Sequence, residues 1–348
     1  MRFHAHARSL SSLICFVLAS WGVASPRAAS AEDLLPVSVE LGDVSLTKLP
    51  FVVAAENQIY ERNGLKVSQF ISPLAAELIR QSSGLIVPKE NVRTGSSDIN
   101  IGGGSPTIVR MTTNAHAPQR VILATTESIA HFHVITRGDI RKIEDLKGKR
   151  IGFSTPGSLS HLSLLQLFDK MGWDSRRDVS LFERGADIKD LTSKKVDAFA
   201  ADVIAFDEAM RAGLYDLADL STFEFPIPGS GVNADKAWLA THRETAARFV
   251  KATVDAVAFM KANKPATLQA MRKWYGIEDP AKQEAIYKEV ARLPSKPYPS
   301  VAGLQKMIDV YDWREMRLHK AADFYDDSFV SELDKSGYID GLVKETTK

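Results

Sequence analysis

The residue types best suited to bind a small molecule stand in loops between predicted strands and helices. One loop, the run TPGS from Thr155 to Ser158, follows an apolar strand-like segment and precedes an apolar helical one. Ser158 has the place of an N-cap residue, whose hydroxyl accepts a hydrogen bond from the first helical turn. Gly104 and Ser105 stand in a similar place, in a glycine-rich loop. Because the N-terminus of a helix presents free backbone N–H groups, both loops predict contacts with a small anion.

Each of these candidates also has a purely structural alternative. Ser105 and Ser158 could cap their helices and contact no ligand, but two caps that face one another across a cleft favour binding. Asp202 ends a predicted strand, so its carboxylate either binds an amine or hydroxyl of the ligand or caps the following helix. Lys48 either pairs with an anion or is a solvated surface lysine.

Further candidates are polar residues of the same loops. They are Thr47, Ser128, Ser160 and His161. His161 lies in the first turn of the helix that Ser158 heads, where its ring could line a pocket. His131 and His133 alternate on one strand and could bring two imidazoles together, but two histidines without a third ligand make a poor metal site. We expect neither a metal nor a cofactor.

No sequence motif of a known catalytic centre is present. The chain has no GxSxG, no HExxH, and neither glycine pattern of a nucleotide site. Its single cysteine, Cys15, lies in an N-terminal apolar run and is expected to be removed with it. The sequence therefore predicts a binding protein rather than an enzyme.

The elements that carry these loops alternate between strand and helix. Val37–Leu41 and Leu65–Ile71 are strand-like and flank a helical segment at 50–62, which is the β-α-β unit of a parallel sheet. Open sheets of this class bind ligands at the carboxyl ends of their strands. Four loops at such ends carry the candidate residues: 44–48, 102–107, 126–130 and 155–160.

The chain is long enough for two lobes, and its order predicts where they divide. Extended residues near 229–234 lead into a long amphipathic helix, Thr241–Asn263, so the chain should return to the first lobe from about Phe225. We assign residues 32–136 and 226–348 to lobe I and residues 137–225 to lobe II. Four more helices should decorate lobe I: 267–275, 280–292, 300–311 and 326–336.

The N-terminus has the features of a cleaved signal peptide covering residues 1–31. Arg2 and Arg8 precede an apolar run of about 14 residues, too short to span a bilayer, and Ala29-Ser30-Ala31 fits a cleavage site. The whole chain carries 44 basic and 43 acidic residues. This near-neutral balance argues against a nucleic-acid surface. We expect a monomer in the periplasm.

The segment from Ile140 to Ser158, IRKIEDLKGKRIGFSTPGS, resembles the nitrate/sulfonate/taurine-type substrate-binding proteins of ABC importers. The resemblance extends over residues 36–336, with one departure at Gln58-Ile59-Tyr60, where the family usually has Gly-Phe-Phe. It implies a periplasmic binding protein fold of type II-like topology, α/β with two parallel-rich sheets flanked by helices and two crossover strands as a hinge.

The same resemblance implies that the protein captures a small anion, of the sulfonate, nitrate or carboxylate class, and delivers it to an ABC permease and its ATPase. Two alternatives remain open from the sequence. One is an enzyme on the same scaffold, similar to the synthase of the thiamine pyrimidine. The other is a ligand sensor that presents its closed form to a membrane receptor.

Overall fold

A computed structural model describes residues 34–83, 85–103, 119–311 and 313–346. These residues belong to one compact unit, Leu34–Lys348, which is described here by itself. The predicted signal peptide, Gly104 and Ser105 lie outside the described residues. No helix among those described is long and apolar enough to cross a membrane.

The first sheet has five strands in the order β2-β1-β3-β10-β4. Its strands are β1 (Leu35–Leu41), β2 (Leu65–Ile71), β3 (Ile99–Gly103), β4 (Arg120–Thr125) and β10 (Ser230–Asp235). β1 pairs in parallel with β2 and β3, whereas β10 runs antiparallel between β3 and β4. Val37, Val39 and Leu41 are buried, as their alternation along β1 predicts.

The second sheet has the order β7-β6-β8-β5-β9. Its strands are β5 (His133–Thr136), β6 (Arg150–Phe153), β7 (Ser180–Glu183), β8 (Ala198–Ala201) and β9 (Tyr215–Asp219). β5 was assigned to lobe I from the sequence, but it pairs with β8 and β9. The reason is that Val134 and Ile135 fill the hydrophobic clusters on opposite faces of this sheet. The division between the sheets therefore precedes His133.

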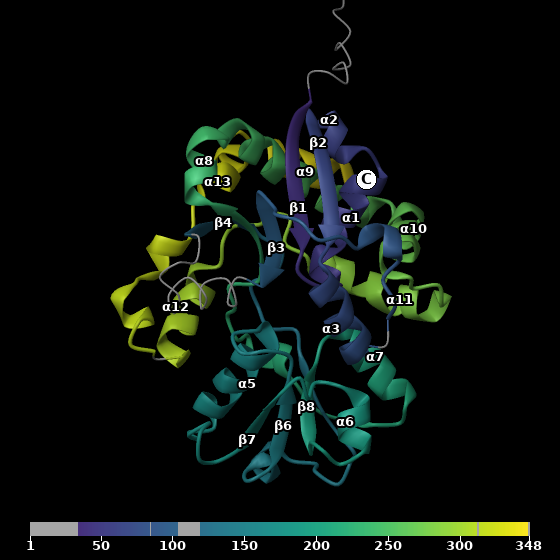
Figure 1. Cartoon of the computed structure of the whole chain (residues 1–348), viewed down its shortest axis with the longest axis vertical. Coiled ribbons are helices and arrows are strands. Elements are labelled where there is room, and N and C mark those ends of the chain that lie inside the picture. Colours follow the sequence, from purple (N-terminus) through teal and green to yellow (C-terminus); the bar gives the residue numbers. More distant parts are fainter. Residues whose placement is uncertain (1–33, 84, 104–118, 312, 347–348) are drawn as a thin grey trace, which may run out of the picture. The chain divides into compact units, whose positions relative to one another are not determined.

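Two segments, 126–132 and 224–229, connect the sheets and run antiparallel to one another (Figure 1). The Ala130 N–H donates to the Phe225 carbonyl at 2.9 Å, and the Ile227 N–H donates to the Ser128 carbonyl at 3.0 Å. The two segments thus correspond to the predicted pair of crossover strands. The predicted α/β class with helix-flanked sheets is confirmed, and both sheets are mixed rather than parallel-rich, because β10 and β5 each pair antiparallel with two neighbours.

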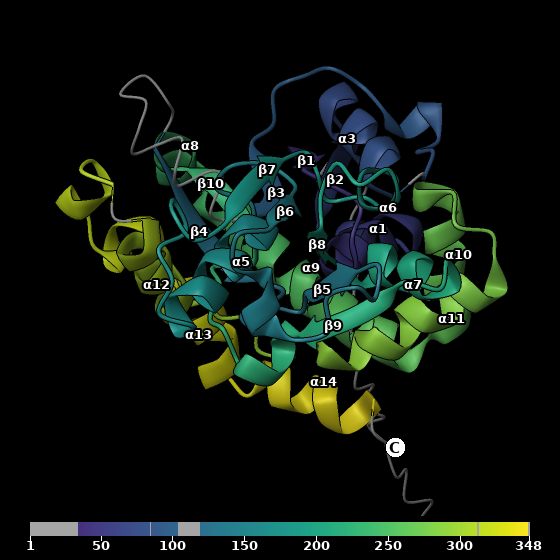
Figure 2. The same ribbon diagram turned by 90° about the horizontal axis from the view of Figure 1, so that it is seen from below.

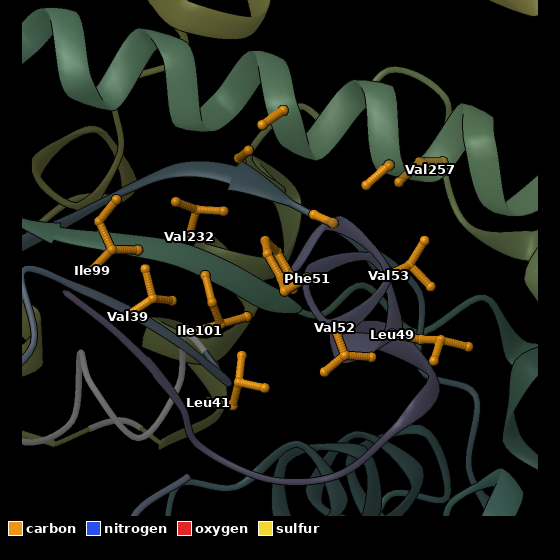
Figure 3. Packing of buried hydrophobic residues seen from close by; sticks show 14 of the residues in the cluster. Val39, Leu41, Leu49, Phe51, Val52, Val53, Ile99, Ile101, Val232 and Val257 are labelled. Atoms are coloured by element: carbon orange, nitrogen blue, oxygen red, sulfur yellow. The ribbon is translucent and has the colours of Figure 1, made fainter. Parts of the chain in front are cut away.

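Helices cover the first sheet and enclose its hydrophobic core. They include α1 (Leu49–Glu56), α2 (Ile59–Arg62), α3 (Pro73–Ser83), α8 (Lys236–Thr241), α9 (Arg243–Ala262), α10 (Lys264–Tyr275), α11 (Pro280–Lys288), α13 (Ser328–Lys335) and α14 (Tyr338–Thr346). Figure 3 shows strand residues Val39, Ile101 and Val232 in one cluster with Phe51 of α1 and Val257 of α9. Burial of such side chains is the main stabilising contribution to this half of the protein.

The second sheet carries α5 (Leu159–Lys170), α6 (Ile188–Thr192) and α7 (Val203–Arg211). It also receives α12 (Val301–Tyr311), which was expected to decorate lobe I. Leu304 and Met307 of α12 instead share a hydrophobic cluster with Leu164 of α5, and Lys306 lies 2.7 Å from the Asp169 carboxylate. The apolar stripe of α12 is buried against α5, which local periodicity alone does not reveal. Figure 2 shows α5 and α12 from below.

Candidate functional site

A cavity of about 390 Å³ opens between the loops of the two sheets. It is formed where parallel strands end: the loop after β1, the loop after β6 and the residue that follows β8. Ligands bind at this edge in open α/β sheets. The polar residues in its wall include Asp43, Thr47, Lys48, Asn100, Glu127, His131, Ser154, Thr155, Ser158, Ser160, Asp202 and Ser230.

Lys48 is buried in the wall, with only 2% of its side chain exposed, so the alternative of a solvated surface lysine is wrong. It ends the short 3-10 helix η1 (Leu46–Lys48). Its Nζ lies 2.7 Å from the Asp43 carboxylate and donates to the Ser230 hydroxyl at 2.6 Å. The Thr47 hydroxyl also bonds to Ser230 at 2.6 Å. The positive charge of Lys48 is therefore already compensated by Asp43.

Ser158 caps α5 and also lines the cavity. Its Oγ accepts from the His161 backbone N–H at 3.2 Å and lies 3.0 Å from the Ser160 Oγ. The Ser160 Oγ in turn accepts from the Ser154 N–H at 3.1 Å. The capping role is thus observed, and the position of both serines in the cavity wall leaves the ligand-binding role as a prediction.

Asp202 likewise combines a cap with a place in the cavity wall. Its Oδ1 accepts from the backbone N–H groups of Ile204 and Ala205, at 3.0 and 2.9 Å, at the start of α7. Its second oxygen has no partner among the residues that the structure describes. Burial raises the pKa of this carboxyl, and the Asp43 charge adds to the effect.

Glu127 and His131 lie in the cavity wall but were not selected from the sequence. Within the described part of the chain, the Glu127 carboxyl has no hydrogen bond or ion pair. Burial raises its pKa to about 8; Lys48 opposes this shift, while Asp43 and Asp202 add to it. The Nδ1 of His131 is buried and has no partner in the described residues.

The signal for Glu127 was its place in the predicted loop 126–130, where Ser128 was chosen instead. His131, just beyond this loop, was considered only together with His133 as a possible pair of metal-binding imidazoles. Ser128 is exposed and does not line the main cavity, although it borders a smaller one of about 100 Å³. Glu127 would have been the better choice, because a half-buried carboxyl that lines a cavity requires a compensating partner.

His161 does not line the cavity. Its ring stacks on Phe153 with centroids 4.3 Å apart, and its Nδ1 accepts from the Gly157 N–H at 3.2 Å. The Tyr311 hydroxyl lies 3.3 Å from the same nitrogen. Burial lowers the pKa of His161 to about 4. These contacts give His161 a structural place between α5 and α12.

The predicted pairing of two imidazoles is not observed. His133 stacks on Phe206 and its Nδ1 lies 3.0 Å from the Asp216 carboxylate. His131 instead borders the cavity. Among the described residues, no group of three or more histidine, cysteine or acidic side chains is placed to hold a metal ion.

Carboxyl groups outnumber basic groups around the cavity. The acidic lining residues are Asp43, Glu127, Asp187, Asp202 and Glu289, and the basic ones are Lys48, Arg184 and Arg292. Arg292 lies 2.6 Å from the Glu289 carboxylate, and the side chain of Arg184 is 62% exposed. The described wall therefore has an excess of acid that its own basic groups do not compensate.

Comparison with solved structures identifies the fold. The periplasmic aliphatic sulphonate binding protein SsuA from Escherichia coli is 17% identical and has a TM-score of 0.60; the match covers 80% of this chain and 87% of the SsuA chain. The periplasmic nitrate-binding protein NrtA from Synechocystis PCC 6803 is 11% identical, with a TM-score of 0.65 and coverages of 87% and 89%. The desulfurization enzyme DSZB is 16% identical, with a TM-score of 0.57 and coverages of 86% and 99%.

Similarity at this level establishes a shared fold, which serves both binding proteins and an enzyme. No curated protein matches this sequence significantly. Residues 47–267, more than half of the chain, match the model of a family described as NMT1/THI5 like. The chain therefore belongs to the NMT1/THI5-like family.

Proposed function

We propose that this chain is the extracytoplasmic solute-binding protein of an ABC importer, acting as a monomer in the periplasm. The observation that carries the proposal is the cavity of about 390 Å³ between two sheets that are joined by two antiparallel segments. Two lobes connected in this way can close about a ligand by bending the connections. The sulfonate-binding and nitrate-binding proteins of the same fold support this function.

The ligand would stabilise the closed state because residues from both sheets line the same cavity. Lys48 and Thr47 contribute from the first sheet, and Ser158 and Asp202 contribute from the second. A ligand shifts the equilibrium only through contacts that it makes better in one state than in the other.

Beyond the cavity, α7 contacts α11 through two ion pairs, so these helices would separate when the lobes open. Arg211 lies 2.5 Å from the Asp279 carboxylate, and Lys282 pairs with Glu208. A permease that separates the lobes would also have to break these pairs. Both side chains of the Arg211–Asp279 pair are 45% exposed, so this pair contributes little energy and can exchange readily, whereas Lys282 and Glu208 are more covered.

An anionic ligand, as the sequence predicts, remains part of the proposal. The donors that favour it are the free backbone N–H groups at the start of α5 and the buried ammonium of Lys48. The excess of carboxyl groups restricts this ligand, because an anion must keep its charge at the Lys48 and α5 end of the cavity and away from Glu127.

The proposal is tested by thermal melts with a panel of small sulfonates, carboxylates, nitrate and amines. A true ligand at a hundredfold excess over its dissociation constant stabilises the folded state by about 2.7 kcal/mol. Mass spectrometry should then recover the ligand chemically unchanged. Turnover of the ligand would favour an enzyme on the same fold, for which DSZB is a precedent. Failure of every compound would count against the solute-binding role.

A further inference from the structure

Resting on the proposed solute-binding role, we infer that the ligand carries a basic nitrogen, as in a protonated amine or amidine, which binds between Glu127 and Asp202. The two carboxyls come from different parts of the fold. Glu127 lies in the first crossover segment, and Asp202 follows β8 in the second sheet. A group held between them would contact the hinge and one lobe together.

The basic residues of the wall already have partners. The Lys48 ammonium is bound by Asp43 and Ser230, and Arg292 is bound by Glu289. Neither cation forms an ion pair with Glu127 or Asp202 in the described residues. Among the described residues, the cavity therefore retains two carboxyls that no basic side chain pairs with.

The carboxyls of Glu127 and Asp202 also have unused hydrogen-bonding capacity among the described residues. One carboxylate oxygen of Asp202 accepts the two hydrogen bonds that cap α7, and Glu127 makes no hydrogen bond among the described residues. In the wall of the same cavity, the buried Nδ1 of His131 also lacks a partner among the described residues. Buried polar groups are normally paired, so unpaired groups that converge on a cavity indicate where a ligand makes its contacts. The group that satisfies carboxylates is an N–H donor, preferably a charged one.

The apolar part of the cavity wall indicates what the remainder of the ligand is. Apolar lining residues include Leu46, Leu78 and Ile79 from the first-sheet side, together with Phe132 and Leu159. An inorganic anion such as nitrate would leave this apolar surface and both carboxyls unused. An organic molecule with a basic nitrogen at one end would use both, and an anionic group at its other end could still reach Lys48 or the start of α5.

Binding of such a ligand should depend on pH. Glu127 faces Lys48, Asp43, Asp202 and Arg292, and burial lowers the pKa of His131 in the same cavity wall. Burial raises the pKa of Glu127 to about 8 in the ligand-free protein, so the carboxyl is mostly protonated below that pH. It must lose this proton before it can pair with a cation. The affinity for a cation should therefore rise by up to tenfold per pH unit below 8 and level off above it.

Calorimetric titration with three compounds of one shape tests the inference: benzamidinium, benzamide and benzoate. We expect benzamidinium to bind most tightly, with an affinity that increases from pH 6 to pH 8. Glu127→Gln and Asp202→Asn should each weaken it at least tenfold. The matched control is Asp235→Asn, because Asp235 caps α8 through Ala237 and Trp238 just as Asp202 caps α7, but lies outside the cavity wall.

The outcomes separate this inference from the proposed function. If benzoate binds more tightly than benzamidinium, or if Glu127→Gln leaves benzamidinium binding unchanged, the basic-nitrogen inference is overturned while a binder remains. The same holds if a panel compound without a basic nitrogen is the only one to bind. If neither these compounds nor the wider panel bind, both proposals fail. Unchanged melting of the ligand-free variants excludes unfolding as the cause of any loss.

Discussion

Replacing Glu127 by Gln should stabilise the ligand-free protein at alkaline pH and have little effect near pH 5. The carboxyl has its pKa raised from 4.5 to about 8 in the folded protein, chiefly by burial. Between these values the unfolded chain loses the proton while the folded protein keeps it. The folded state then binds more protons than the unfolded state, so stability falls as the pH rises through this window. Glutamine resembles the protonated acid in shape and does not ionise.

The size of the effect follows from the pKa difference. One pKa unit corresponds to about 1.4 kcal/mol, so a shift from 4.5 to about 8 costs the wild-type protein about 5 kcal/mol at most. Relaxation of the cavity and entry of water would reduce this value. The difference in the free energy of unfolding between Glu127→Gln and wild type should thus increase by several kcal/mol between pH 5 and pH 8.5.

Urea unfolding at the two pH values measures this difference. The protein must first be unfolded and refolded to remove bound ligand, because a bound cation would stabilise the ionised carboxyl. Glu90→Gln, at an exposed carboxyl, controls for the chemical change itself. Equal differences between Glu127→Gln and wild type at pH 5 and pH 8.5 would refute the claim that Glu127 is held in an uncompensated site.

Further substitutions test the packing and the caps. Gly303→Ala should destabilise the folded protein by more than 1 kcal/mol in urea unfolding, because the added Cβ would lie 2.0 Å from the Ile227 carbonyl carbon. Gly341→Ala is the matched control: its Cβ would meet open space in α14, so it should stabilise the protein by about 0.5–1 kcal/mol. Burial lowers the pKa of His161 from 6.5 to about 4, so the wild-type protein loses stability as the pH falls through this range. His161→Gln should reduce this acid-induced loss in the free energy of unfolding by about 3 kcal/mol. Unfolding at pH 7 and pH 4.5 checks it, and an unaltered pH dependence would contradict the burial of the imidazole. Ser158→Ala should cost about 1 kcal/mol of folding stability, because the helix cap is lost. Calorimetry with the identified ligand should show a further loss of roughly 1–3 kcal/mol in the free energy of binding. Unchanged affinity would show that Ser158 only caps the helix.

Local sequence patterns were sufficient to predict β1, β2 and the loops after β1 and β6 that line the cavity, but they did not predict β9. The alternation along β1 identified its buried face, and Thr47, Lys48, Ser158, Ser160 and Asp202 all lie in the cavity wall. These successes share a cause: turn formers and capping residues mark the ends of strands and helices within a few residues.

The incorrect and missed features depend on contacts between distant segments. The sequence around β5 does not show that its partners are β8 and β9, and the apolar stripe of α12 does not identify α5 as its neighbour. The pairing of Lys48 with Asp43 and the isolation of Glu127 emerge only when the two sheets face one another. Charge balance in the cavity therefore could not be predicted from the residues of one loop.

Mass spectrometry of the compound released when freshly purified protein is denatured tests the central claim most directly. The account predicts one small organic molecule, containing a basic nitrogen, that copurifies with the wild-type protein and with Asp235→Asn but is depleted in Glu127→Gln and Asp202→Asn. The same molecule, added to refolded protein, should raise the melting temperature and be recovered intact. A copurified molecule retained equally by all four proteins, or one that the protein converts into a product, would contradict the account.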